Sequence, residues 1–248
     1  MKIIPLSEGS FTIDSTKLFV PFDNSADQLQ ERPVGSLLVE IQPFLIITDK
    51  DVLLIDTGLG FSDASGKLQL YKNLEEHGIH PEDVTKVLMS HLHKDHAGGV
   101  SRFDKATGKK ILSFPKAKYF VSRKEIDFAF EKGLPSYIPE ELECLKESTQ
   151  VILLGDHGVI EGYIKYEMTG AHSPFHQVFW IVDGDQRIFF GGDDAPQLQQ
   201  MKNRFVAKYD FDGRKSMELR HKWWQQGATE HWTFLFYHDI NSPVVERE

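Results

Sequence analysis

The chain has 248 residues, of which 40% are hydrophobic and 12% aromatic, and it carries a formal net charge of −9 at neutral pH. This composition predicts an ordinary globular protein rather than a disordered one, and the length suits one large domain or two small ones. Because the negative charge offers no basic surface to a polyanion, neither nucleic acid nor a membrane is an expected partner.

Short runs of β-branched and aromatic residues predict strands, and apolar residues recurring every three to four positions predict helices. Strands are expected at 37–48, 52–56, 86–90, 118–122, 151–154, 163–169, 177–182, 187–191 and 233–237. Helices are expected at 64–77, 123–131, 139–147 and 213–226. No repeat, low-complexity tract or linker divides the sequence, which predicts a single domain over residues 1–248. Segments 14–36 and 101–118 are expected to be irregular and to cover a surface site.

The cysteine content and the N-terminal sequence indicate in which cellular compartment the protein is expected. The only cysteine, Cys144, excludes an internal disulfide and a thiolate-rich metal site, and it is compatible with a reducing environment. The apolar run Met1–Leu6 is too short for a secretory signal. No stretch approaches the roughly 18 apolar residues that a spanning helix needs. We therefore expect a cytoplasmic protein.

The densest chemical motif follows the expected strand 86–90. Over six positions the sequence places His91, His93, Asp95 and His96, directly before Ala97-Gly98-Gly99. Imidazole nitrogens and carboxylate oxygens are the ligands that zinc and similar divalent ions prefer. A tight loop that enters a helix can point such residues in two directions, toward two ions. A solvated polar loop is the alternative, but the glycines favour a loop that closely surrounds a bound group.

This motif resembles the metallo-β-lactamase superfamily, in which H-x-H-x-D-H closes a strand. The superfamily's next ligand is a histidine in a turn before a strand, and His172 takes that position in the turn 169–176. His176 of the same turn either supports the ligands or packs the turn. A bridging aspartate is expected in a Gly-Asp step, where Asp193 is favoured over Asp194. The last ligand is expected to close the final strand, at His238.

The resemblance also implies a fold and a supporting residue. Asp56 ends a hydrophobic strand at a glycine turn, as in the superfamily, and it would accept an imidazole N–H behind the ligands. A turn cap is its alternative role. The implied fold is of the α+β class, a four-layer αβ/βα sandwich of two mixed β-sheets flanked by helices.

Two divalent metal ions are implied, with zinc preferred and iron or manganese as alternatives. The implied ligands are His91, His93 and His172 for one ion, Asp95, His96 and His238 for the other, and Asp193 as the bridge. A hydroxide between the ions would attack an ester, lactone, thioester or related bond of a small molecule. Asp95 and Asp193 would be catalytic, with Asp95 collecting the released proton. The protein is expected to act as a monomer or homodimer.

The chain looks closest to the acyl-homoserine-lactone lactonases among superfamily members. These enzymes commonly carry a tyrosine three positions after the bridging aspartate, where this sequence has Pro196. Tyr209 or Tyr137 is a candidate to replace its hydroxyl. The alternative from another class is an iron-dependent oxidoreductase, similar to persulfide dioxygenases, on the same ligands. A binding protein with a vestigial site is disfavoured because the ligand set is complete.

Overall fold

Two six-stranded sheets carry the fold in the computed structural model, which describes residues 1–247. The first sheet has the order β1-β5-β6-β7-β10-β11 and the second β12-β13-β14-β15-β16-β17. Each sheet contains both parallel and antiparallel pairs. The first comprises β1 (Lys2–Pro5), β5 (Phe44–Ile47), β6 (Val52–Ile55), β7 (Lys86–Leu88), β10 (Lys118–Ser122) and β11 (Val151–Leu154). The second comprises β12 (His157–Ile160), β13 (Ile164–Met168), β14 (Gln177–Asp183), β15 (Gln186–Phe190), β16 (Trp232–Leu235) and β17 (Val244–Glu246).

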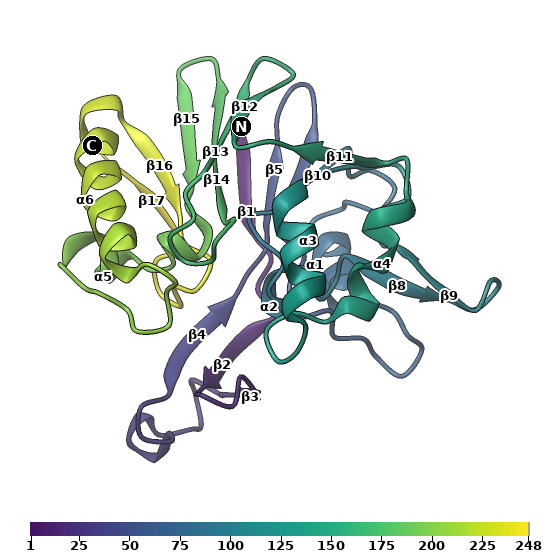
Figure 1. Cartoon of the computed structure of the whole chain (residues 1–248), viewed down its shortest axis with the longest axis horizontal. Coiled ribbons are helices and arrows are strands. Elements are labelled where there is room, and N and C mark those ends of the chain that lie inside the picture. The colour runs from purple at the N-terminus through teal and green to yellow at the C-terminus, as the bar shows by residue number, and fades with distance from the viewer. Residues whose placement is uncertain (248) are drawn as a thin grey trace.

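Helices cover the two outer faces (Figure 1). Beside the first sheet lie α1 (Gln69–Glu75), α3 (Arg123–Lys132) and α4 (Pro139–Glu147). Beside the second lie α5 (Leu198–Lys202) and α6 (Gly213–Glu230). The smaller elements are β2 (Gly9–Ile13), β3 (Phe19–Pro21) and β4 (Leu37–Ile41) in a three-stranded sheet, the hairpin of β8 (Ser101–Asp104) and β9 (Lys109–Leu112), and the one-turn helix α2 (Lys94–Ala97). The expected αβ/βα sandwich of the α+β class is confirmed.

Alternation along the strands separates three apolar layers. In β5, Phe44 and Ile46 point between the two sheets, whereas Leu45 points to the outer face. In β14, Phe179 points between the sheets and Val178 points toward the α6 side. Because successive strand residues face opposite sides, strands that are apolar on both faces require a covering layer on each side. The sequence therefore forms a sandwich of layers rather than a sheet with one solvent-exposed face.

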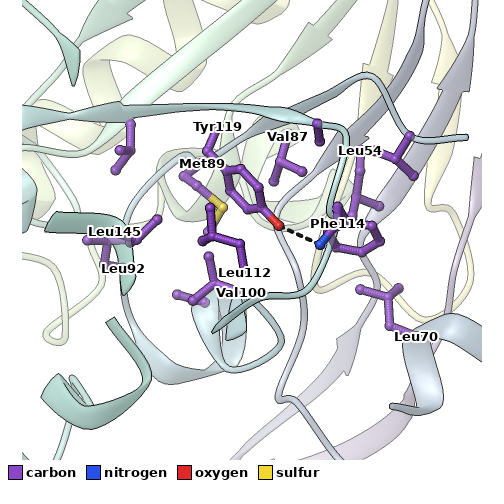
Figure 2. Packing of buried hydrophobic residues seen from close by; sticks show 14 of the residues in the cluster. Leu54, Leu70, Val87, Met89, Leu92, Val100, Leu112, Phe114, Tyr119 and Leu145 are labelled. Carbon is purple, nitrogen blue, oxygen red and sulfur yellow. Dashed lines mark hydrogen bonds between the residues drawn. The ribbon is translucent and has the colours of Figure 1, made fainter. Parts of the chain in front are cut away.

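The outer layer of the first sheet is close-packed around Tyr119 (Figure 2). Its ring lies among Val87 and Met89 of the sheet region and Leu145 of α4. The phenolic oxygen accepts a hydrogen bond from the Phe114 N–H at 2.8 Å. That bond compensates the cost of burying a hydroxyl, and each fully buried apolar side chain contributes about 1.5–3 kcal/mol. This layer holds β7 and β10 in place within the first sheet, and the histidine motif follows β7.

Helix ends follow local sequence signals. The Ser122 side chain caps α3 by accepting from the Glu125 N–H at 3.3 Å. Asp212 caps α6 by accepting from the Lys215 N–H at 3.0 Å. Pro139 occupies the first turn of α4, where its missing N–H costs nothing. These signals explain why the expected helices 123–131 and 139–147 agree closely with the structure.

Three expectations for the elements are wrong. The expected strand 37–48 is two strands in different sheets, because Pro43 cannot donate a ladder hydrogen bond. The helix expected from residue 64 begins at Gln69, since Gly66 has a φ of 86° within a turn. Segment 101–118 is not irregular: it begins with the β8–β9 hairpin, which packs against α4. Among residues 1–247, no helix is both long and apolar enough to cross a bilayer.

Candidate metal centre

The loop after β7 is held in place by two buried carboxylates. The Asp56 carboxylate accepts from the Ser90 N–H and from its hydroxyl, both at 2.7 Å. The Glu125 carboxylate of α3 accepts from the Leu92 N–H at 3.0 Å. The chain then turns into α2, which begins directly after His93. Hydrogen bonds from neighbouring elements therefore fix the backbone that carries the histidine motif.

The structure brings the seven expected ligand residues together as two adjoining groups. One group is His91, His93, His172 and Asp193, and the other is Asp95, His96 and His238. Within each group, one candidate ligand atom from every residue lies within 4.8 Å of the others. The residues come from the loop after β7, the helix α2, the turn before β14, the turn after β15 and the segment after β16. Strand ends of both sheets thus meet at one site.

Asp193 lies between the two groups. Its Oδ2 lies 3.2 Å from Nε2 of His172, and its Oδ1 lies 3.0 Å from Nε2 of His96. Oδ1 is also 3.0 Å from Nε2 of His238. One carboxylate oxygen therefore faces each group, which is the arrangement that a bridging ligand requires. The carboxylate of the neighbouring Asp194 instead accepts from the backbone N–H of His172.

Unpartnered atoms at the centre fit a metal site. His96 Nε2 and Asp193 Oδ1 are buried and, although they lie 3.0 Å apart, neither makes a hydrogen bond of acceptable geometry. His91 Nε2 and His93 Nδ1 face each other at 2.9 Å, and His93 Nδ1 lies 3.2 Å from His172 Nε2. Buried polar atoms are normally paired, and converging imidazole nitrogens bind divalent ions. The His/Asp donor set thus fits divalent metal ions.

Electrostatics favour the metal-binding protonation states of His91, His93 and Asp193, but not that of His96. Burial lowers the pKa of His91 and His93 well below the usual range, and neighbouring imidazoles lower it further. Burial alone would raise the pKa of Asp193, but His238 and His96 hold it well below the usual range. Burial opposes protonation of His96, yet the Asp193 carboxylate raises the pKa of that ring. Neutral imidazoles and ionised carboxylates are the species that coordinate a cation, so metal binding at His96 would release a proton.

Acceptors behind the rings set their orientation. The Asp56 Oδ2 lies 2.8 Å from His96 Nδ1. The Glu40 carbonyl oxygen lies 2.7 Å from His238 Nδ1, and the Asp210 Oδ1 lies 2.9 Å from His172 Nδ1. Each contact leaves the ring's Nε2 directed at the centre, as outer partners of metal-binding histidines do. The sequence indicated Asp56, but it gave no signal for Glu40 or Asp210.

Comparison with known proteins decides the family. A sequence profile of the metallo-beta-lactamase superfamily matches residues 40–221. The chain belongs to this superfamily.

Relatives with similar sequences include N-acyl homoserine lactonases. The N-acyl homoserine lactonase of Bacillus cereus is 26% identical, over 90% of this chain and 92% of its own length. The N-acyl homoserine lactonase AttM of Azorhizobium caulinodans is 42% identical over a shorter region, 21% of this chain and 16% of its own length. These relatives and the His/Asp cluster make the protein a metal-dependent hydrolase of the metallo-β-lactamase superfamily, homologous to lactonases.

Solved structures show the same fold. A probable metal-dependent hydrolase from Staphylococcus aureus superposes with a TM-score of 0.78 at 23% identity, covering 99% of this chain and 91% of its own. The dizinc quorum-quenching lactonase AidC superposes with a TM-score of 0.72 at 23% identity, covering 98% of this chain and 88% of its own. At these identities the likeness is one of fold.

Within the superfamily fold, a second aspartate and a histidine support the turn that carries His172. Asp194 Oδ1 accepts from the His172 N–H at 2.6 Å, and Oδ2 accepts from the Thr169 hydroxyl. His176 Nδ1 lies 3.1 Å from Asp194 Oδ2, and its Nε2 accepts from the Asp193 N–H at 3.1 Å. Arg220 of α6 donates to the Asp194 carbonyl oxygen at 2.9 Å. His176 thus lies behind the cluster and connects two of its turns.

A further buried acid supports the loop that follows Asp56. Glu8 Oε2 accepts from the Leu59 N–H at 2.7 Å, and its Oε1 has no partner. Burial raises the pKa of Glu8 to about 7, although the bond from Leu59 opposes that rise. Sequence reasoning missed this residue, because Glu8 lies far along the chain from the loop that it contacts.

Glycines allow the Asp56 loop to touch the ligand loop. Gly60 has a φ of 74°, and a Cβ on it would lie 2.2 Å from the Gly98 carbonyl oxygen. Gly66 has a similar φ of 86°, but nothing lies within 4 Å of its Cβ position. We expect Gly60→Ala to lower the free energy of unfolding by more than about 3 kcal/mol, from strain plus a backbone clash. Gly66→Ala should cost only about 1 kcal/mol.

Urea unfolding of the metal-free protein, followed by circular dichroism, measures both variants. If the two substitutions cost the same, the close approach of Gly60 to Gly98 does not contribute to stability.

A cavity of about 400 Å³ opens beside the two ligand groups. It reaches His93, Asp95, His172, Asp193 and His238. Part of its wall comes from the segment 14–36 expected to cover the site, namely from Asp14, Ser15, Lys17, Phe19 and Gly35. Segment 101–118 contributes no lining residue, so the expectation that it covers the site is wrong.

The two candidate tyrosines have different surroundings. Tyr209 lines the cavity, and its hydroxyl lies 3.2 Å from Nε2 of Gln200. Tyr137 is buried behind His93, and its hydroxyl donates to Glu125 at 3.2 Å. Pro196 also lines the cavity. Only Tyr209 of this pair has access to the cavity.

Proposed function

We propose that the protein is a dinuclear metal-dependent hydrolase that cleaves a lactone or a related ester or thioester of a small molecule. The observation that carries the proposal is Asp193, whose two carboxylate oxygens face two separate groups of ligands. The lactonase homologues support the choice of bond. They favour hydrolysis over the iron-dependent persulfide chemistry that the same ligands could serve.

The proposed ligand assignment follows the two groups. One ion would be held by His91, His93 and His172, and the other would be held by Asp95, His96 and His238. Asp193 would bind both ions. Zinc suits this donor set, and the similar fold of a dizinc lactonase supports that metal. When bound, a pair of such ions lowers the pKa of water and polarises the bond to be cleaved. Asp56 and His176 would keep the ligand rings and turns in position.

Two residues of the chain itself are suited to proton handling. Asp95 lies in the cavity wall, with Oδ2 3.6 Å from Nε2 of His238. Its carboxylate can receive the proton released during hydrolysis and pass it to solvent. Tyr209 faces the same cavity, and burial raises its pKa to about 12 although its bond to Gln200 opposes this. A phenol that stays protonated can donate a hydrogen bond to the oxygen that gains charge, which replaces the hydroxyl missing at Pro196.

We also propose that residues 1–248 form one domain, because both large sheets bury side chains in the same inner layer. A small-molecule substrate fits the cavity volume of about 400 Å³.

Metal content tests the dinuclear assignment. We expect two ions for each chain, and about one for His238→Ala, with kcat/KM falling at least about a hundredfold in that variant. The exposed His77 lies outside both groups, so His77→Ala should keep two ions and full activity. Elemental analysis of the dialysed protein gives the count. A single tightly bound ion in the unsubstituted chain would contradict the proposal.

The bond type is tested with lactones, thioesters, aryl esters and phosphodiesters on zinc-, manganese- and iron-loaded protein. A hundredfold preference for lactones, about 2.7 kcal/mol in barrier, would establish the lactonase reaction. If the iron-loaded protein instead consumed oxygen with a persulfide and hydrolysed no panel member, the reaction would be that of a persulfide dioxygenase and not of a lactonase.

A further inference from the structure

The cavity beside the ligand groups carries an unusual set of charges for an acidic protein. Three lysines line it, namely Lys17 before β3, Lys94 at the start of α2 and Lys208 next to Tyr209. The chain as a whole has 37 acidic and 28 basic side chains. The lining thus holds as many lysines as aspartates, whereas acidic side chains outnumber basic ones in the chain as a whole.

None of the three lysines forms an ion pair within residues 1–247, whereas eight other lysines do. Lys17 and Lys94 are both partly buried. The Lys94 ammonium lies 5.7 Å from the centroid of the Phe19 ring, a distance at which a cation and an aromatic face attract each other. Both lysines line the cavity together with His93 of the first ligand group.

The acids of the same cavity are already engaged. The Asp14 carboxylate accepts from the Thr16 N–H at 2.8 Å and from its hydroxyl at 2.6 Å. Asp95 and Asp193 belong to the proposed metal centre. Lys17 and Lys94 are therefore partly buried cations that form no ion pair with these acids in the described part of the chain. Burying like charges together is unfavourable unless an anion joins them.

Apolar side chains complete the wall next to these lysines. Phe19, Leu37, Leu38 and Val39 line the cavity together with Ile13. An apolar chain would lie against them, and a charged end would find the ammonium groups. The wall therefore combines an apolar face with a cationic one.

We propose that the substrate has an anionic group, a carboxylate or a phosphate, at the end of a short apolar chain, and that Lys17 and Lys94 bind this group. The inference rests on the proposed function, since it concerns the substrate of that same site. Lys17 and Lys94 are specificity-determining residues, and they recognise a part of the substrate remote from the bond that is broken. A neutral acyl chain would leave both ammonium groups without a partner.

Matched ring-opened products test the binding site independently of turnover. The probes are N-hexanoyl-homoserine, N-adipoyl-homoserine and the analogue with a terminal phosphonate, titrated calorimetrically into the metal-loaded protein. At least one of the two charged-tail probes should bind about tenfold or more tightly than the neutral-tail probe. Its advantage should shrink at least about threefold when salt is raised, because ammonium–anion attraction is screened. The stronger of the two identifies the anion.

Substitutions test the residues. In Lys17→Gln/Lys94→Gln the ratio of charged-tail to neutral-tail affinity should fall about tenfold, and Lys17→Arg/Lys94→Arg should keep it. The exposed Lys116 does not line the cavity and forms no ion pair among the described residues, so Lys116→Gln is the matched control. Equal affinities for the probes, no detectable binding of the charged ones, or equal ratios in the Gln variant and the unsubstituted chain would overturn the inference.

Turnover of the corresponding lactones separates the two proposals. Hydrolysis of all three lactones at equal kcat/KM, with no charge preference in binding, would sustain the hydrolase and remove the anion site. A charge preference in binding without hydrolysis of any lactone would sustain the anion site and remove the lactonase reaction.

Discussion

Asp193→Ala is expected to lower kcat/KM by at least about a thousandfold, because one substitution removes the group that faces both sets of ligands. The side chain lies in the turn after β15, and its contacts are with candidate ligand histidines. The backbone N–H of Asp193 donates to His176, and this bond survives the substitution. Loss of activity should therefore accompany a retained fold.

Three measurements check this result: kcat/KM on a responsive lactone, bound metal by elemental analysis, and far-ultraviolet circular dichroism. Bound metal should fall below two ions for each chain. The control is Asp185→Ala, in the exposed turn between β14 and β15. If Asp193→Ala kept both the metal and the rate, the bridging role would be refuted.

Asp194→Ala is expected to lower the free energy of unfolding by about 3–5 kcal/mol, although the residue is adjacent to Asp193. Its buried carboxylate accepts from the His172 N–H, from the Thr169 hydroxyl and from the Ser216 hydroxyl of α6. Burial alone would raise the pKa of Asp194, but His176 and the hydrogen bonds hold it below the usual range. Removal of the charge leaves several buried donors unpaired.

Urea unfolding of metal-free protein measures this cost, since bound metal would otherwise contribute to stability. Asp185→Ala again serves as the control and should leave the midpoint unchanged. An equally small effect of Asp194→Ala would mean that the turn before β14 is held by other contacts.

The ligand cluster could be predicted because most of its information is local. Four of the seven residues lie within six positions, and local spacing on a tight turn limits where they can point. His172, Asp193 and His238 were assigned by resemblance and not by spacing, since they meet the others only after both sheets pack. The fold class followed from strand alternation and from the superfamily motif together.

Residues that act through long-range packing were not predictable. Asp210 reaches His172 only because the segment before α6 folds back over the second sheet. Glu8 precedes β2 and supports a loop fifty residues later. Pro43 divides one apolar run into strands of two different sheets, a division that hydrophobicity alone does not show. In each case the deciding partner is distant in sequence.

Much of the cavity wall is built by the strands and turns before residue 40, which lie outside the superfamily match at 40–221. Ile13, Lys17, Phe19 and Leu37 therefore lie outside the matched region, whereas six of the seven candidate ligands lie inside it. Such a division would let natural variation, or an engineer, alter the cavity-facing side chains of this segment. Substrate preference would then change, and the bond-breaking apparatus would be inherited intact.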